Sequence, residues 1–518
     1  MKRCPECRRD YYDDSLTFCL EDGTPLVQGS VDVEMSTAIL PGTALDQNTH
    51  VLPRGSDPSL GAGNSIAVLP FINISNDVEN EYFCDGLAEE LLNALSKIED
   101  LKVAARTSAF SFKGGNVHIS EIGRLLGVNT VLEGSVRKAG DRIRITAQLI
   151  NARDGYHLWS ETYDREMKDI FDVQDEITLA LVEALKVKLL GHQQAAVLKH
   201  YTESPDAYDL YLRGISCFTK FTPEFFQKAI ESHEKAIEID PQFAAAYASL
   251  AEAYSEMSFF DSPQQWMPKA KQAARRAIEI DDRLGNAHNS LGVTMMYYDR
   301  DFAGAEREFK RAIELDPGSA HIHMWYGWFL GLTRRFAEAI ERMRLAQRLD
   351  PLSHLIGFGI GAIYLWSGQV DVAIDQLRSL TELNRDFPLG YTYLADAFIE
   401  KGDIDAALAT IENDAISLDD PICLAAAAYV YAKAGKRDRA LAKLGGLEGS
   451  PVLAEALSVQ IAQVYLGLGD EDRAIEWVER AIQTSSVWLI WLGVEPIFHR
   501  LRSNPRFVTL TRNLNLPE

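Results

Sequence analysis

The chain contains 518 residues, of which 47% are hydrophobic and 25% charged, and its formal net charge is −23. A chain of this length exceeds what one hydrophobic core can organise, which predicts three or more folding units. The acidic charge repels phosphate backbones and argues against general affinity for nucleic acid. The first residues lack the apolar core of a secretory signal, and no stretch approaches the ~18 apolar residues of a membrane helix. We therefore expect a cytoplasmic protein without a membrane span.

Residues 1–27 carry three of the six cysteines. Cys4 and Cys7 are separated by two residues, a spacing that places two thiolates at one edge of a metal tetrahedron, and Cys19 begins a second knuckle. The segment thus resembles a zinc ribbon, although Asp22 stands where a ribbon has Cys or His. The sequence predicts one zinc ion bound by Cys4, Cys7 and Cys19, with Asp22 or water as the fourth ligand. The alternative is that Asp22 only forms a turn with the glycine after it, and that the site is weak or lost.

Two regions with different composition follow this cysteine segment. Residues 28–64 are rich in Gly, Pro, Ser, Thr and Asp without sustained periodicity, which is typical of a flexible linker. Residues 65–192 alternate strand and helix signals, and we expect a small α/β sheet domain there. The predicted strands are 66–71, 101–105, 130–136, 143–150 and 157–163, and the predicted helices are 82–98, 119–126, stopped by Gly127, and 170–190.

Residues 65–192 also carry motifs of a known family. They include SIAVLPF, EYFCDGLAEELLNALS, RTSAFSFKG and LGVNTVLEGSVRKAGDRIRITAQLINARDGYHLWSETYDRE. With these motifs the segment resembles the TolB amino-terminal-like domain. In that family the domain typically joins a signalling module to carboxy-terminal repeats. The resemblance implies a signalling context but does not define its output.

A helix-end signature then returns at nearly constant spacing through the rest of the chain. Its Asp or Asn stands at positions 240, 281, 316, 350, 384 and 419, so the steps are 41, 35, 34, 34 and 35 residues. A period of about 34 residues is that of the tetratricopeptide repeat, which pairs two helices per repeat. The longer first step indicates an insertion near residues 259–266. The pattern predicts about eight repeats over residues 207–483, and residues 484–518 are expected to form a helical cap.

The repeat pattern matches the family at the residues where two helices cross. One repeat has Gly327, Ala339, Met343, Ala346 and Pro351 at the positions of the family's Gly, first Ala, Phe, second Ala and Pro. Small residues at a crossing let two helix backbones approach, while larger apolar residues fill the next repeat's groove. The fold class is therefore a multidomain, mainly α protein: a tetratricopeptide superhelix preceded by a small α/β sheet domain and a short zinc-ribbon-like knuckle.

Two classes of function fit this organisation. The first is a non-enzymatic scaffold or signalling adaptor that binds a protein or peptide partner in the repeat groove, because no catalytic constellation stands out. The alternative is a transcription-associated regulator that contacts nucleic acid through the zinc-ribbon-like segment. The acidic charge and the lack of a helix-turn-helix pattern favour the first class.

The repeat pattern also predicts which side chains face a partner. In the family pattern the first helix of each pair lines the concave face, with its second, fifth, ninth and twelfth positions in the groove. Gly327 and Gly361 each mark an eighth position. The predicted groove residues are Asn289, His321, Met324, Trp328, Leu355, Phe358, Leu365 and Asp396. An exposed Trp, Phe and Met suit a peptide with an apolar anchor. The alternative is that Trp328 and Phe358 are buried and only stabilise the superhelix.

Overall fold

The computed structural model describes residues 64–516, except 76, 78–79, 99, 116, 188–199, 220–221 and 414–419, and three short strands nearer the amino terminus. The chain forms two compact units, Met1–Pro58 and Ser59–Glu518. In the first unit, β1 (Lys2–Arg3) pairs antiparallel with β2 (Asp10–Tyr11) and with β3 (Val27–Gln28). The predicted zinc ligands Cys4, Cys7, Cys19 and Asp22 lie outside the described residues.

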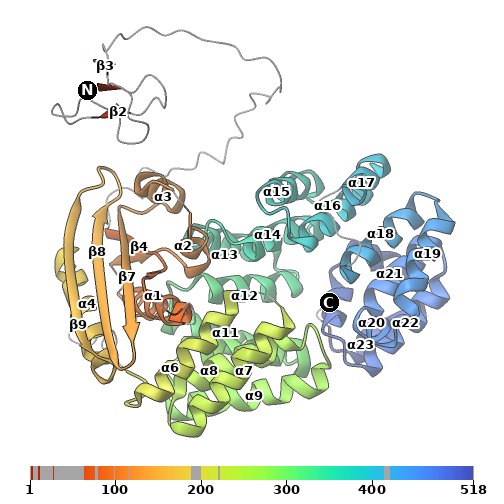
Figure 1. Ribbon diagram of the computed structural model, residues 1–518. Coiled ribbons are helices and arrows are strands. Elements are labelled where there is room, and N and C mark those ends of the chain that lie inside the picture. Colours follow the sequence, from red (N-terminus) through yellow and green to blue (C-terminus); the bar gives the residue numbers. More distant parts are fainter. Residues whose placement is uncertain are drawn as a thin grey trace. The chain divides into compact units, whose positions relative to one another are not determined.

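The second unit begins with a mixed sheet whose strand order is β6-β4-β7-β8-β9, with β5 (Ile72–Asn73) also pairing with β7. Figure 1 shows β7, β8 and β9 side by side in this sheet. The parallel strands are β4 (Asn64–Val68), β6 (Leu101–Val103) and β7 (Thr130–Ala139), and the strands β8 (Arg142–Asn151) and β9 (His157–Glu166) continue antiparallel. Gly140 has a φ of 58° in the two-residue turn between β7 and β8. A left-handed turn of this kind matches the twist of a hairpin, as the sequence indicated.

Helices cover both faces of this sheet. The long helices α1 (Glu81–Ser96) and α4 (Ile170–Ala184) pack on the face to which Ile143 and Ile145 of β8 point. The short helix α3 (Ile119–Leu126) packs on the other face, against Ala67 and Val131. It ends at Gly127, whose φ of 66° is the left-handed cap that the sequence predicted. The predicted strand and helix order is therefore observed, with β5 and the short α2 (Arg106–Phe110) added.

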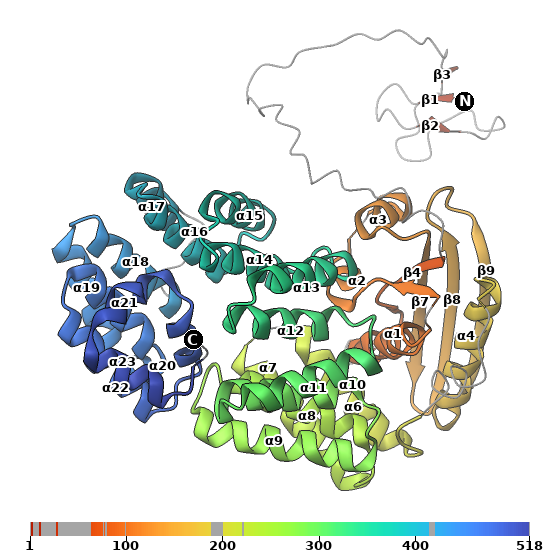
Figure 2. The same cartoon turned by 180° about the vertical axis from the view of Figure 1, so that it is seen from behind.

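Antiparallel helix pairs make up most of the rest of the unit (Figure 2). The first helices of the pairs are α6 (Pro205–Ser216), α8 (Ala244–Met257), α10 (Gly285–Thr294), α12 (Ala320–Leu332), α14 (His354–Trp366), α16 (Pro388–Lys401), α18 (Pro421–Lys433) and α21 (Ser458–Leu468). The second helices are α7 (Pro223–Ile239), α9 (Pro263–Ile280), α11 (Phe302–Leu315), α13 (Phe336–Leu349), α15 (Val370–Leu383), α17 (Ile404–Ile411), α19 (Arg437–Glu448) and α22 (Glu471–Gln483). A π-helical turn, η5 (Met295–Asp299), extends α10, and the short α20 (Pro451–Ala456) precedes α21.

Small residues let the helices of a pair approach closely. A Cβ added at Gly361 of α14 would lie 2.6 Å from the side chain of Leu377 on α15, and one at Gly327 would lie 2.9 Å from Met343. The long first step in the repeat spacing has a structural cause, because α9 contains 18 residues where α11 and α13 contain 14. The turn before α9 is also extended. Neighbouring first helices from α8 to α21 contact one another, and we call the surface that they form together the inner groove.

The chain after the last pair is also helical. It consists of two 3-10 helices, η6 (Val487–Gly493) and η7 (Pro496–Ser503), followed by α23 (Pro505–Asn513). Across the described residues, none of the helices combines the length and the apolar character that crossing a membrane requires.

Candidate partner-binding groove

The predicted groove residues lie on four successive first helices, α10, α12, α14 and α16. Their exposure differs from the prediction. His321, Leu355 and Asp396 are half-buried, whereas the other five are buried. The exposed fractions of those five are 2% for Asn289, 5% for Met324, 6% for Trp328, 3% for Phe358 and 3% for Leu365. The expectation of an exposed Trp, Phe and Met is therefore wrong, and the alternative of burial agrees with the structure.

The aromatic side chains are buried because a later segment of the chain covers the inner groove. The ring of Trp491, on η6, lies 5.3 Å from that of Trp328 and 5.2 Å from that of Trp366. Phe358 packs edge-on against Tyr393 at 4.8 Å. At such separations aromatic pairs add to the stabilisation that burial alone provides. The repeat pattern identified the inward positions but gave no sign of what would lie on them.

A second tryptophan of η6 reaches another part of the array. Trp488 packs edge-on against Phe259, in the turn between α8 and α9, with 6.2 Å between the ring centres. This is the turn that the sequence marked as an insertion. A cavity of about 180 Å³ beside the contact is lined by Phe260, Pro263, Val452 and other residues from both ends of the array. Residues 484–518 thus do more than cap the last repeat, because they also contact the second repeat.

Glu495, just beyond η6, is the polar attachment of this segment. It is 7% exposed and accepts hydrogen bonds from the hydroxyl of Tyr393 and, at 3.0 Å, from the amide of Gln463. Asp396 lines the same small cavity, of about 40 Å³. Burial raises the pKa of Glu495 to about 7. Burial and the nearby charges of Glu495 and Glu400 also raise the pKa of Asp396. The groove therefore holds two carboxyl groups that resist being ionised together.

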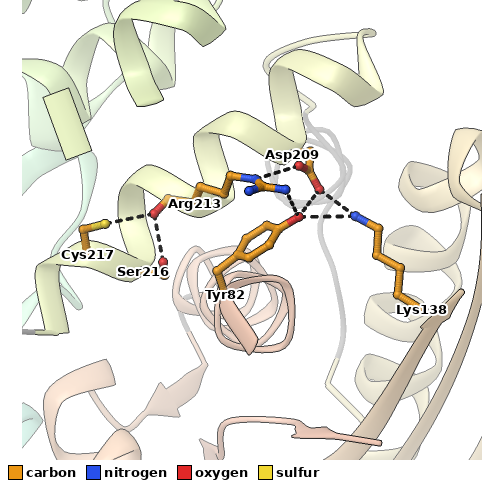
Figure 3. Close-up of polar contacts among 6 residues, drawn as sticks. All are labelled: Tyr82, Lys138, Asp209, Arg213, Ser216 and Cys217. Carbon is orange, nitrogen blue, oxygen red and sulfur yellow. Dashed lines mark hydrogen bonds and ion pairs between the residues drawn. The ribbon is translucent and has the colours of Figure 1, made fainter. Parts of the chain in front are cut away.

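The α/β domain is fixed to the first repeat by a cluster around Asp209 of α6 (Figure 3). Tyr82 of α1 donates a hydrogen bond to Asp209 at 2.7 Å, and Lys138 of β7 donates one at 2.9 Å. Arg213 donates to Asp209 at 3.0 Å and to the Tyr82 hydroxyl at 2.9 Å. Burial alone would raise the pKa of Asp209, but the hydrogen bonds from Tyr82 and Lys138 hold that pKa below its usual value. Below the cluster, a Cβ added at Gly86 would lie 2.8 Å from that of Leu212, so α1 and α6 touch at a glycine.

A second joint lies four repeats later, at the turn between α13 and α14. The hydroxyl of Ser108, on α2, donates to the carboxylate of Asp350 and accepts from the backbone N–H of Leu352 at 2.8 Å. The backbone N–H of Ala105 donates to the carbonyl of Leu349 at 3.0 Å. Both Ser108 and Asp350 are buried. The repeat signature Leu-Asp-Pro is thus used here as a docking site for α2, which sequence reasoning did not foresee.

Part of the inner groove stays accessible between α8 and α12. His321 and Glu252 face each other at 3.7 Å, with 35% and 27% of their side chains exposed. Trp325 donates its indole N–H to His321 at 2.9 Å. One turn further along α8, burial followed by the charge of Glu252 raises the pKa of Glu256 to about 8. The open part of the groove therefore presents the carboxylate of Glu252, whereas burial favours the neutral form of Glu256.

The described residues offer little for metal chemistry. Within them no group of three or more His, Cys, Asp or Glu side chains is arranged to hold a metal ion. Cys84, Cys217 and Cys423 are free thiols, and that of Cys217 donates to the carbonyl of Arg213 at 3.3 Å.

Family comparisons match three parts of the chain. Residues 297–354 and 457–486 match models of the tetratricopeptide repeat. Residues 62–180 match the model described as the second domain of the HilA/YgeH-like transcriptional regulator, so the resemblance to the TolB amino-terminal-like domain stays a prediction. Two segments of the helix-pair array thus contain tetratricopeptide repeats, and stacked repeats of this kind form extended concave surfaces for binding other proteins.

Similarity to known proteins covers only part of each chain. The chain is 41% identical over 250 residues to the putative adenylate cyclase 3 of Rhizobium meliloti, covering 47% of this chain and 42% of the relative. It is 30% identical over 226 residues to the transcriptional regulator HilA of Salmonella typhimurium, covering 38% of this chain and 40% of that protein. The chain thus spans about two-fifths of these relatives. Among solved structures, the alignment with yeast Tom70 covers 85% of this chain and 89% of the Tom70 chain, at 16% identity and a TM-score of 0.40.

Proposed function

We propose that the chain is a non-enzymatic scaffold or signalling adaptor of the cytoplasm, and that its inner groove binds a segment of a protein partner. One observation supports this proposal above the others: the groove already seats residues 487–495 of the chain itself, through two tryptophans and one carboxyl group. A surface that accommodates a nine-residue segment, most of it a 3-10 helix, has the dimensions and the aromatic lining that peptide recognition needs.

In this proposal the α/β domain positions the first helices of the groove. It is joined to the first repeat through Asp209 and to the turn at Asp350, so a ligand that shifts α1 or α2 would also shift the helices of the groove. Coupling of this kind suits an adaptor that reports the state of one domain to a partner of the other.

A second candidate is a transcription-associated regulator. It is favoured by the match of residues 62–180 to a domain of a transcriptional regulator. The predicted contact would be made by the zinc-ribbon-like segment. The net charge of −23 opposes it, because nucleic-acid binding depends on neutralising phosphates with Lys and Arg. One relative is named a putative adenylate cyclase, so the lack of enzyme activity in this chain is itself a part of our proposal.

The test is a selection from a displayed library of short peptides on the purified full-length protein. We expect enriched peptides to bind with Kd values of roughly micromolar size and to photo-crosslink to first helices between α8 and α16. Glu252→Lys, in the open part of the groove, should weaken their binding at least roughly fivefold. Glu341→Lys is the matched control, because Glu341 is exposed on the second helix α13.

Two outcomes would count against the scaffold. Crosslinks confined to the outer helices or to β9, with equal effects of Glu252→Lys and Glu341→Lys, would mean that the inner groove is not the binding surface. Tight binding of duplex DNA at physiological salt, without any selected peptide, would favour the regulator instead.

A further inference from the structure

Residues 487–495, which we call the strap, are anchored at both ends to the last helix pair. Before the strap, the backbone N–H of Ser486 donates to the carbonyl of Ala481 on α22 at 3.0 Å. After it, Arg500 pairs with Glu471 at 2.8 Å, and Arg506 pairs with Glu479 at 2.7 Å, both on α22. Phe498 and Leu501 are fully buried beside these pairs. The anchors do not depend on the strap, so it could leave the groove while both of its ends stay in place.

The middle of the strap contacts helices far from its anchors. Trp491 lies against Trp328, Trp366 and, at 6.3 Å, Tyr393. Its indole N–H, like that of Trp366, is buried without a hydrogen bond of normal geometry in the described part of the chain, although the hydroxyl of Tyr297 lies near it. A buried donor without an acceptor costs free energy. Around Trp491 the strap is therefore held by apolar contact. Its polar contacts lie nearer its carboxyl end, at Glu495 and at the carbonyl of Gly493, which accepts from Arg502 at 2.7 Å.

Charge opposes the strap at its carboxyl end. Glu495 lies in a pocket with Asp396, and Glu400 is close enough to raise the pKa of both carboxyl groups. The other ionisable groups that act on this pocket are the hydroxyls of Tyr297, Tyr393 and Tyr429, the cation Lys433, which acts on Glu400, and Arg500, which acts on Tyr429. No cation forms an ion pair with Glu495 or Asp396 in the described part of the chain. A third carboxylate in this place is a poor match to the surface beneath it.

We propose that the strap is a displaceable occupant of the inner groove, and that the surface beneath it binds a partner segment in which a tryptophan is followed, four residues later, by a basic residue. The aromatic pocket under Trp491 supplies the anchor site. Asp396 and Glu400 would pair with a lysine or arginine at the place of Glu495, and the part-exposed carboxylate of Glu252 lies in the open part of the groove. The inference rests on the proposed function and adds to it the partner's chemistry and a built-in competitor.

Competition follows from the tether. Because both anchors keep the strap beside the groove, its effective concentration is on the order of millimolar, and a free peptide must overcome that advantage. A partner with a cation at the position of Glu495 gains binding free energy there, because Asp396 and Glu400 attract a cation and repel the carboxylate of the strap.

The experiment uses the full-length protein and two fluorescent peptides with the sequence of residues 485–497. One peptide has the native sequence, and the other carries Glu495→Lys. Trp491→Ala in the protein should release the strap, which raises hydrogen exchange of amides 487–495 by at least roughly tenfold while α22 and α23 stay protected. The lysine peptide should bind this variant at least roughly tenfold more tightly than the wild type, and more tightly than the native peptide does.

The outcomes separate the two proposals. If exchange reports a released strap and neither peptide binds, the inner groove is not a peptide site and the proposed function fails. If the lysine peptide binds the wild type and the variant equally, the strap does not compete and this inference fails alone. Equal affinity of the two peptides overturns the charge preference.

A second variant covers the case in which Trp491→Ala loses protection throughout the array. Glu495→Lys in the protein should pair with Asp396 and slow the exchange of amides 487–495 severalfold relative to the wild type. Glu341→Lys, on the outer surface, should leave that exchange unchanged. Exchange in Glu495→Lys that equals or exceeds the wild-type rate would overturn the proposal.

Discussion

Trp328→Ala distinguishes a core residue from an accessible groove residue. The side chain is 6% exposed, and its ring lies 5.4 Å from Phe358, 5.6 Å from Trp366 and 5.3 Å from Trp491. Truncating a buried tryptophan costs about 3–5 kcal/mol, because burial is lost and a cavity remains. The three ring contacts are included in that figure, since their energies do not add independently.

The assay is thermal unfolding followed by helical circular dichroism, which does not depend on tryptophan emission. Taking ~1 °C per kcal/mol for a compact unit as long as Ser59–Glu518, we expect Tm to fall by about 3–5 °C. Tyr156→Ala is the matched control, an aromatic-to-alanine change at a side chain that is 74% exposed. Its Tm should change by less than about 1 °C.

The structure predicts a second effect of Trp328→Ala, on the strap. Because Trp328 is one of the rings that hold Trp491, its loss should also raise hydrogen exchange in residues 487–495. A Trp328→Ala protein that melts like the Tyr156→Ala control, with unchanged exchange of the strap, would show that this indole is not buried against Trp491.

Three further predictions follow from other parts of the chain. His233 is fully buried, and burial lowers its pKa to about 3, so below pH ~6.5 the unfolded chain binds a proton that the native state does not, and wild-type stability falls. In urea titrations the unfolding free energy of His233→Leu should rise by ~2 kcal/mol relative to wild type between pH 6.5 and 5, and no relative rise would contradict the burial. Ser108→Ala leaves Asp350 buried without its hydroxyl donor, so we expect a loss of ~1–3 kcal/mol and faster exchange in α2, whereas an unchanged α2 would refute the second joint. Metal analysis of the full-length protein should find one zinc per chain that Cys7→Ser removes, and zinc-free wild type would disprove the predicted ribbon.

Local pattern was enough to place most of the helices and strands. The left-handed cap at Gly127, the hairpin turn at Gly140 and the 34-residue spacing of the helix ends each depend on neighbours within one turn or one repeat. The missed pieces are short: β5 has two residues and α2 has five. Elements of that size are fixed by what they pack against, and the sequence of α2 alone gives no sign that its serine meets Asp350.

The candidate site also has a part that local sequence pattern predicted and a part that it did not. Repeat phase placed Trp328, Phe358 and Asp396 on first helices, where they are found. The position of a residue within its repeat predicts which way its side chain points. It does not predict that residues 487–495, at the other end of the array, will cover that side chain. The contact between Trp328 and Trp491 joins positions separated by four repeats, and it decides whether the inner groove is open or filled. Sequence determined the inward face of the array, and only tertiary structure decided what covers it, because burial is set by long-range packing and periodicity is a local property.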